Sequence, residues 1–396
     1  MRIMIVIANA YGMGGTIRTV FNLAEGLAAR HQVEIVSLAQ HRRTPFFTPP
    51  KDVTLTSLSP MDAEETGPPK RSLLDRWRER RYGGVIPLTE ARRSHAVYAG
   101  EKVHALRVHL ETSDADVVMG TRPGINLLVA RWAPTRMLRI GQEHVHLDNH
   151  APDVRSAIRR HYHGLDGLSV LTHADKRAYQ DFLEIPPGWL ATMPNALPSG
   201  NYPRSTQDNP IIAAAGRMAP TKQYPKLLEA FRAVAAAHPQ WRLRIYGGGK
   251  RDEALREKIT EAGLSNQVAL MGRAKDLTGE LAKASILAVS SRTEGFGMTI
   301  IEGFSVGVPV VSFDCPRGPR EIIDHERNGL LVPHQDVDAL AAGLLRLAED
   351  RDERLRMAEE AAASAADYDI SVITRRWEEF LEERRTAKGR GRAAAA

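Results

Sequence analysis

Two patterns of hydrophobic residues alternate along the chain. Short apolar runs without alternation are separated by stretches in which apolar residues recur at helical spacing. Unbroken runs predict strands buried on both faces of a parallel sheet, and the recurring positions predict amphipathic helices. The predicted strands are residues 3–8, 33–38, 53–58, 116–120, 137–142, 168–171, 211–215, 242–246, 268–271, 286–289, 310–313 and 330–332. This repeated βα alternation predicts an α/β fold of two Rossmann-like domains in series.

The predicted helices include residues 88–110, 127–133 and 174–182. A proline-rich stretch near residues 193–203 is typical of an interdomain linker. The domains that we predict are therefore residues 1–198 and 199–368, followed by a helix at 369–385 and a disordered tail at 386–396. The helix carries an apolar stripe that needs a surface to pack on: Ile373, Trp377, Phe380 and Leu381.

Composition narrows the class of protein. The chain of 396 residues is 43% hydrophobic and 26% charged, as expected of a soluble globular protein with about two domains. No apolar run reaches the length of a transmembrane helix, and the first residues lack a signal-peptide pattern. Cys315 is the only cysteine, which excludes an internal disulfide and a thiolate metal cluster. We expect a cytoplasmic protein.

The net charge of +6 is unevenly spread: Lys388, Arg390 and Arg392 mark the tail, and basic residues outnumber acidic ones in one segment of the first domain. Its basic residues are Lys70, Arg71, Arg76, Arg78, Arg80, Arg81, Arg92 and Arg93. Such a patch suits an anionic partner, such as a phosphate polymer, a membrane surface or nucleic acid, and is also typical of a plain solvated face. Leu73, Leu74 and Trp77 lie at helical spacing within it, so an amphipathic helix at a lipid interface is one interpretation.

A glycine turn follows the first predicted strand. The sequence Gly12-Met13-Gly14-Gly15 between strand and helix resembles a dinucleotide-binding turn, and Glu34 lies near the distance expected of a ribose-binding acid. The third glycine of that fingerprint is missing, however, and Glu34 lies near the start of its strand. A dinucleotide-dependent oxidoreductase is therefore the weaker interpretation of this turn.

A histidine-rich loop follows the strand at 137–142. It contains His144, His146 and His150, which makes a metal site a possible interpretation. His144 and His146 lie at strand spacing without the helical frame of a zinc motif. We therefore expect no metal.

Three groups of candidate ligand-binding residues end strands of the second domain, where ligands bind in such sheets. The first is Gly216-Arg217 with Lys222, two cations at a helix start. The second is the glycine run 247–249, and the third is the stretch 290–309 with Glu294, Gly297 and Glu302. A glycine turn at a helix N-terminus binds anions, and carboxylates beside it can accept hydrogen bonds from sugar hydroxyls. Alternatively, Thr299 and Glu302 have the spacing of a capping box, which would make Glu302 a helix-start residue only.

In this order, these motifs resemble the retaining glycosyltransferases of the GT-B fold, group 1 (family 4). The marks are Glu294 and Glu302 at E-x7-E spacing, Gly216-Arg217 with Lys222, and the strand entry at 307–311 followed by Glu321. The resemblance covers nearly the whole chain. It implies two Rossmann-like domains that face a central cleft, with the C-terminal helix returning to the first domain. The chain departs from the family pattern at Gln223 and Gly303.

The resemblance implies a role for each matching residue of the second domain. Arg217 and Lys222 would bind the nucleotide diphosphate, Glu302 the ribose, and Glu294 a hydroxyl of the donor sugar. The backbone near Arg273 would meet the base. Four residues would offer backbone amides to sugar and phosphate: Phe296, Gly297, Met298 and Thr299.

In the first domain, Gly15 would approach the phosphate, and the active-site histidine of the family matches His144, with His146 as the alternative. Glu294 and His144 are the residues that we expect to act in catalysis. No metal and no cofactor are expected beyond the nucleotide-sugar co-substrate, which we expect to be UDP-linked.

The leading hypothesis is therefore retaining transfer of a hexose from a nucleotide sugar to a hydroxyl acceptor. As the glycosidic bond breaks, cations and a helix N-terminus stabilise the charge of the leaving diphosphate. The basic segment favours an anionic polyol polymer or a lipid-linked saccharide as acceptor, at the inner face of the membrane, and no nucleic-acid partner is expected. The alternatives are a GT-B nucleotide-sugar epimerase, an oxidoreductase and a non-catalytic binding protein.

Overall fold

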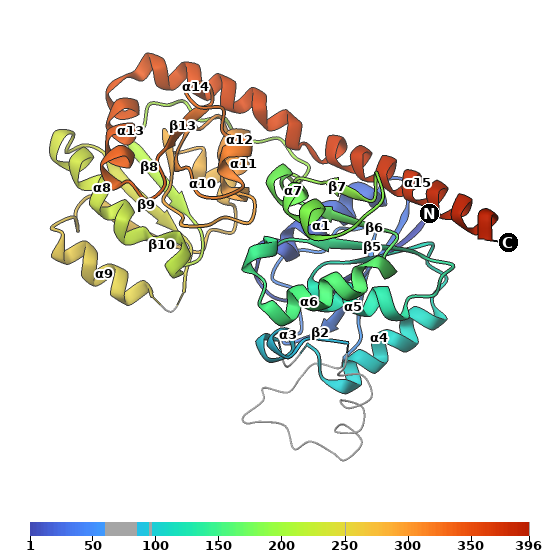
Figure 1. The fold of residues 1–396 in the computed structure, drawn as a ribbon. Helices are drawn as coiled ribbons and strands as arrows, with labels where there is room; N and C mark the ends of the chain where they lie inside the picture. Colours follow the sequence, from blue (N-terminus) through green and yellow to red (C-terminus); the bar gives the residue numbers. More distant parts are fainter. Residues whose placement is uncertain (60–84, 95–96, 250, 396) are drawn as a thin grey trace. The chain divides into compact units, whose positions relative to one another are not determined.

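The computed structural model describes residues 1–59, 85–94, 97–249 and 251–395, and within them the chain forms two compact units (Figure 1). The first contains Met1–Ala196 together with the chain from Ile370 onward, and the second contains Leu197–Asp369. Each unit has a parallel sheet of its own, which confirms the prediction of two Rossmann-like domains. The boundaries between the units lie at 196–197 and 369–370, within two residues of the predicted ones at 198–199 and 368–369.

The sheet of the first unit has seven strands in the order β3-β2-β1-β4-β5-β6-β7. They are β1 Arg2–Asn9, β2 Gln32–Ala39, β3 Val53–Ser57, β4 Val117–Gly120, β5 Leu138–Glu143, β6 Gly167–Val170 and β7 Leu190–Thr192. The described helices of this unit are α1 Gly15–Ala28, α3 Leu88–Arg93, α4 Gly100–Thr112, α5 Pro123–Trp132, α6 Pro152–His161, α7 His173–Phe182 and α15 Ile370–Ala395, with short 3-10 turns η1 Leu147–Asn149 and η2 Tyr162–Gly164.

Both faces of this sheet are buried, which explains the unbroken apolar runs. Ile3, Ile5 and Ile7 of β1 belong to the core on one face, with α1 and α15, whereas Met4 and Val6 belong to the core on the other face. Because successive strand residues point to opposite faces, each position of β1 from Ile3 to Ile7 meets an apolar layer.

Helix α15 packs on the first unit, as predicted. Ile373, Trp377, Phe380 and Leu381 are buried in the same core as the apolar residues of α1. The apolar stripe of this helix is thus covered, although the helix follows the second unit in the chain.

The sheet of the second unit has six strands in the order β10-β9-β8-β11-β12-β13. They are β8 Ile211–Ala215, β9 Arg242–Tyr246, β10 Val268–Gly272, β11 Ile286–Val289, β12 Val310–Phe313 and β13 Gly329–Val332. The described helices are α8 Tyr224–Ala237, α9 Asp252–Glu261, α10 Leu277–Leu281, α11 Met298–Ser305, α12 Pro319–Ile322, α13 Val337–Glu349 and α14 Arg351–Ser364, with 3-10 turns η3 Pro220–Lys222 and η4 Ala365–Tyr368.

Two expectations differ from the structure. The single helix predicted at 88–110 is divided into α3 and α4, because Ser94 leaves the helical region (φ −139°, ψ 48°) and closes α3. The segment for which we expected a disordered tail, 386–396, continues α15 as far as Ala395. Strand β7, at the edge of the first sheet, had no predicted counterpart.

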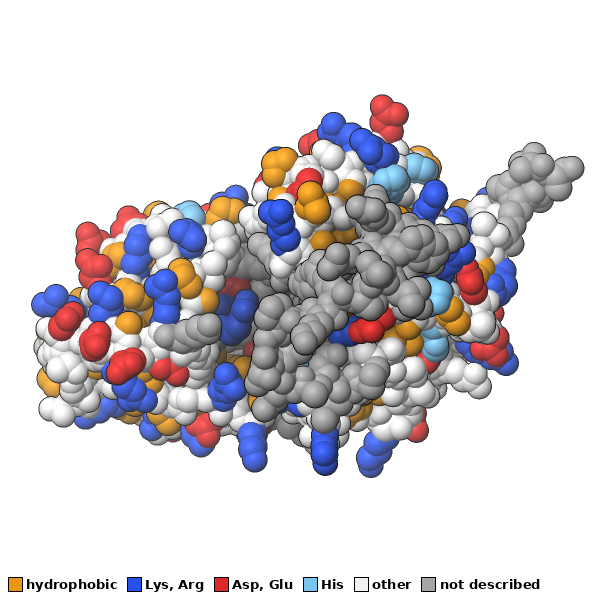
Figure 2. All heavy atoms as spheres, turned by 90° about the horizontal axis from the view of Figure 1, so that it is seen from below, with side chains coloured by type: hydrophobic (Ala, Val, Ile, Leu, Met, Phe, Trp, Pro, Cys, Tyr) orange, Lys and Arg blue, Asp and Glu red, His pale blue; other side chains and the backbone are white. Residues whose placement is uncertain are grey.

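On the face drawn in Figure 2, basic and acidic side chains of the described residues are interspersed. The basic residues of the segment 70–81 lie outside the described residues, together with Leu73, Leu74 and Trp77. The basic surface expected there, and its anionic partner, are therefore still predictions.

Close packing of α1 against α15 gives a test of how the first unit holds its C-terminal helix. A Cβ added at Gly26 would lie 2.0 Å from Oγ1 of Thr374 and 2.9 Å from Cγ1 of Ile370. We expect Gly26→Val to lower the free energy of unfolding by about 2 kcal/mol through overpacking. Gly389→Val is the control, because a Cβ at Gly389 meets no atom within 4 Å. Equal melting temperatures for the two variants would contradict this packing.

Candidate functional site

The candidate site of the second unit lies at the point where the strand order of its sheet reverses. From β8 the chain proceeds to β9 and β10 on one side, and from β11 it proceeds to β12 and β13 on the other. β8 and β11 are hydrogen-bonded neighbours, so the loops that follow them leave the same edge of the sheet. Such a reversal opens a crevice at the carboxyl ends of the strands, where ligands bind in open α/β sheets.

The loop after β8 supplies the cations. Gly216 donates its backbone N–H to Tyr246 at 2.9 Å and has a φ of 151°. Arg217 follows it, and its exposed side chain makes no hydrogen bond or ion pair with a described residue. Lys222 ends the turn η3 and is half-buried. The structure thus places both predicted cations at the edge of the sheet.

The loop after β11 supplies the carboxylate and the helix start. Gly297 has a φ of 113°, a conformation that favours glycine, and is the N-cap of α11. The N-cap glycine has no side chain to cap this helix. The Ile300 N–H donates to the Gly297 carbonyl at 2.8 Å, which leaves the N–H groups of Met298 and Thr299 for a ligand or solvent.

The capping-box interpretation of Thr299 and Glu302 is wrong. The helix begins at Met298, before Thr299, so Thr299 does not occupy the N-cap position that this motif requires. Glu302 lies further along α11 and is only 3% exposed.

An ion pair joins the two loops. Nζ of Lys222 donates to Oε1 of Glu294 at 2.6 Å, and both side chains are mostly buried. The Ser291 hydroxyl donates to the same carboxylate oxygen. The backbone is also connected, because Ser290 Oγ donates to the Lys222 carbonyl at 2.8 Å and the Arg292 N–H donates to the Thr221 carbonyl at 2.8 Å.

The charge of Glu294 affects neighbours that the sequence analysis did not single out. Burial raises the pKa of the Tyr224 phenol, and the nearby Glu294 charge acts in the same direction. Burial also raises the pKa of the Cys315 thiol to about 12, again with Glu294 adding to the effect. Two buried groups near this carboxylate are therefore neutral, and Lys222 is its countercharge. Ser290 and Ser291 were recognisable as polar residues directly after a buried strand.

The remaining predicted donor residues also lie at this edge. Arg273 follows β10, and its Nε lies near Gly248, in the loop after β9. Phe296 is buried, with its ring 5.8 Å from that of Tyr368, so only the backbone of Phe296 is available to a ligand. Met298 and Thr299 form the first turn of α11.

In the first unit, the strand order reverses between the neighbouring strands β1 and β4. Gly15, predicted to approach phosphate, is the first residue of α1, and a Cβ added there meets no atom within 4 Å. Packing does not require glycine at this position. Glu34, the acid of the dinucleotide interpretation, accepts from Thr56 Oγ1 at 2.6 Å and lies 3.3 Å from His109. These contacts give Glu34 a structural role.

The histidines of the loop after β5 differ in their surroundings. His144 is half-buried and donates from Nε2 to Oε1 of Gln142 at 3.2 Å. Burial lowers the pKa of His144 to about 4, so the ring is neutral near pH 7. His146 is buried and donates from Nδ1 to Asp175 at 2.7 Å. Geometry therefore favours His144 as the residue open to a ligand.

Within residues 1–59, 85–94, 97–249 and 251–395, no group of three His, Cys, Asp or Glu side chains has the geometry to hold a metal ion.

Comparison with known proteins shows which family the second unit resembles. Residues 202–364 match the family model of the glycosyl transferases group 1. The chain is 33% identical over 372 residues to an exopolysaccharide phosphotransferase of Streptomyces coelicolor, across 94% of this chain and 39% of that protein. It is 27% identical over 183 residues to a poly(ribitol-phosphate) alpha-N-acetylglucosaminyltransferase of Staphylococcus aureus, across 46% of this chain and 37% of that protein.

The fold is also that of solved structures. A variant of S. aureus TarM, in a crystal structure with fondaparinux, alpha-GlcNAc-glycerol and UDP, superposes with a TM-score of 0.76 at 15% identity, over 96% of this chain and 99% of that one. The second unit thus matches the group 1 glycosyltransferases, and the chain as a whole has the GT-B fold of these solved structures.

The family match contains every predicted residue from Arg217 to Glu302, whereas Gly15 and His144 lie outside it. This chain spans about two fifths of the length of both curated relatives. Among the described helices, none is both long and apolar enough to cross a bilayer.

The neutral state of His144 predicts a pH dependence of stability. Unfolded, His144 has a pKa near 6.5, so the unfolded chain binds more protons than the folded one between pH 6.5 and about 4. The contribution to stability is complete above pH 6.5 and is lost as the pH falls through this window. We expect His144→Gln to reduce the loss of unfolding free energy between pH 7 and pH 5 by about 1–2 kcal/mol.

Denaturant unfolding at the two pH values measures this effect. His163→Gln, at an exposed position of the same unit, is the control. An unchanged pH dependence in His144→Gln would contradict the lowered pKa of His144.

Proposed function

We propose that this protein is a group 1 glycosyltransferase that transfers a hexose from a UDP-sugar to a hydroxyl acceptor with retention of the anomeric configuration. The observation that carries the proposal is the Lys222–Glu294 pair, at the reversal of the second sheet and beside the uncapped N-terminus of α11. A cation, free helix amides and a carboxylate are the groups needed for a diphosphate joined to a sugar.

Arg217, Lys222 and the N-terminus of α11 bind the diphosphate in this proposal. Lys222 has three N–H donors, and only one is needed for Glu294. The exposed guanidinium of Arg217 adds a second cation. Glu302 accepts from the ribose, and the backbone beside Arg273 contacts the base. These groups stabilise the charge that develops on the leaving diphosphate.

Glu294 accepts a hydrogen bond from a sugar hydroxyl and orients the anomeric carbon. The acceptor hydroxyl attacks from the face that the diphosphate leaves, and the diphosphate oxygen takes its proton. No protein nucleophile is required for this route. In the first unit, Gly15 and His144 are the residues that we propose to act at the donor, with His144 as a neutral hydrogen-bond donor.

For the acceptor, we propose an anionic polyol polymer or a lipid-linked saccharide. The names of the similar proteins support this class, because one acts on poly(ribitol-phosphate) and another was crystallised with alpha-GlcNAc-glycerol. The basic segment of the sequence fits the same class, and it suggests contact with the inner face of the membrane.

A second candidate reaction is transfer of a glycosyl phosphate. It is favoured by the S. coelicolor relative, whose name is that of a phosphotransferase. The two reactions differ in the bond that breaks: glycosyl transfer releases UDP, and glycosyl-phosphate transfer from a UDP-sugar releases UMP. Epimerisation would convert the donor to an epimeric nucleotide sugar, with no acceptor and no net release of nucleotide.

Lys222→Ala tests the diphosphate assignment. We expect it to weaken UDP binding about 10- to 100-fold, measured by calorimetry, because it removes a charge-assisted contact. Glu294→Ala should lower turnover more than UDP affinity, because its proposed partner is the sugar. Lys283→Ala is the matched control, since Lys283 also pairs with a carboxylate at 2.6 Å, that of Glu280. Unchanged UDP affinity in Lys222→Ala would refute the assignment.

Removal of divalent ions tests whether the proposed reaction needs a metal. Because protein cations take the charge of the diphosphate in this proposal, turnover should be equal with and without EDTA. Loss of turnover in EDTA, restored by a divalent cation, would contradict the metal-independent mechanism.

A further inference from the structure

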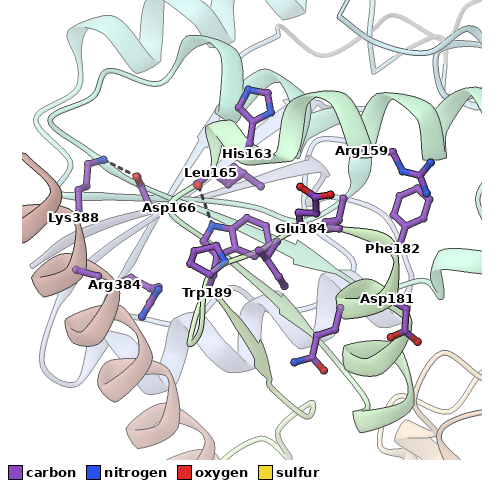
Figure 3. Close-up of a pocket in the computed structure, with 15 residues that line it drawn as sticks. Arg159, His163, Leu165, Asp166, Asp181, Phe182, Glu184, Trp189, Arg384 and Lys388 are labelled. Carbon is purple, nitrogen blue, oxygen red and sulfur yellow. Dashed lines mark hydrogen bonds and ion pairs between the residues drawn. The ribbon is translucent and has the colours of Figure 1, made fainter. Parts of the chain in front are cut away.

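A large pocket lies in the first unit, at the amino ends of the strands of its sheet. The predicted ligand-binding residues, in contrast, follow the carboxyl ends of strands. Its volume is about 930 Å³, within the range of small-molecule sites. Leu165 and Asp166 precede β6, and Trp189 precedes β7, so these walls lie at the amino ends of the strands. Helix α15 closes one side with Arg384 and Lys388 (Figure 3).

Arg384 is the unusual residue of this pocket. It is only 9% exposed, and its buried Nε has no hydrogen-bond partner. Among the described residues, none forms an ion pair with it. Its aliphatic stem packs against Gly167, and Gly188 leaves room for its guanidinium. A buried cation without a partner is costly, so an anion brought by a ligand would offset that cost.

The other charges of the pocket leave this cation uncompensated. Asp166 accepts from Lys388 at 2.6 Å and from the Arg139 backbone at 2.8 Å, so its carboxylate is already engaged. Asp181 and Glu184 line the pocket but are exposed to solvent.

Aromatic side chains supply walls for a larger ligand. The guanidinium of Arg159 lies 4.2 Å from the ring centroid of Phe182 (Figure 3). The Trp189 ring is buried and donates from Nε1 to the Leu165 carbonyl at 3.1 Å, which fixes its orientation. Aromatic faces next to cations are suited to a sugar that carries an anionic group.

We propose that this pocket is a second ligand site, which binds a small phosphorylated saccharide with its phosphate on Arg384. The site is independent of the proposed donor site, because the groups that form it belong to the other unit and to the amino ends of its strands. Arg384 forms the charge-assisted hydrogen bonds, Arg159 adds a cation at the rim, and Trp189 contacts the sugar.

The test is calorimetric titration of the full chain with inorganic phosphate and with glucose 1-phosphate, in low salt and excess UDP. We expect saturable binding of both, tighter for glucose 1-phosphate because the walls contact the sugar. Arg384→Gln should weaken both about tenfold or more. Arg385→Gln, which removes an exposed arginine paired with Glu382 on the same helix, should change affinity less than about twofold.

A melting curve in anion-free buffer separates binding from packing. Removal of an unpaired buried charge should leave the melting temperature of Arg384→Gln equal to or above that of wild type. If this variant does not fold, Arg384→Lys keeps the charge and the stem, and should still bind more weakly. Absence of saturable binding to wild type would overturn the proposal. Unchanged affinities in Arg384→Gln would also overturn it, as would unchanged affinities in Arg384→Lys if Arg384→Gln does not fold.

Discussion

The reversal of strand order between β8 and β11 is the constraint on which the candidate donor site depends. It places two loops, distant in sequence, at one edge of the sheet, and the Lys222–Glu294 ion pair joins them across 72 residues of chain. Because both charges are mostly buried, removal of either would leave the other uncompensated. Each charge therefore fixes the position of the other. A ligand that binds here can take over part of the interactions of this ion pair.

The rest of the second unit supports that arrangement. The strands β8 and β11 are buried, so the loops start from fixed points. Gly297 turns the chain into α11 without a capping side chain, which leaves the helix amides for an anion. Cys315 and Tyr224 are neutral buried groups near Glu294, so Lys222 supplies its countercharge.

Much of this organisation could be predicted from sequence, for physical reasons. Strands buried on both faces leave unbroken apolar runs, and ligands in such sheets bind after the strands, so Arg217, Lys222 and Glu294 could be located at strand ends. The direct pairing of Lys222 with Glu294 could not be predicted, because local pattern does not state which strands are neighbours. The break at Ser94 was missed because apolar spacing continues across it. The pocket at Arg384 was also missed, since it joins α15 to segments far away in the sequence.

The most direct test of the central claim is the nucleotide released when the protein is incubated with a panel of nucleotide sugars, with and without a polyol-phosphate acceptor. The account predicts release of UDP from one UDP-hexose, dependent on acceptor, with the same anomeric configuration in product and donor. Release of UMP would assign glycosyl-phosphate transfer to the site instead. Release without acceptor, or no release from any UDP-sugar, would contradict the proposed reaction.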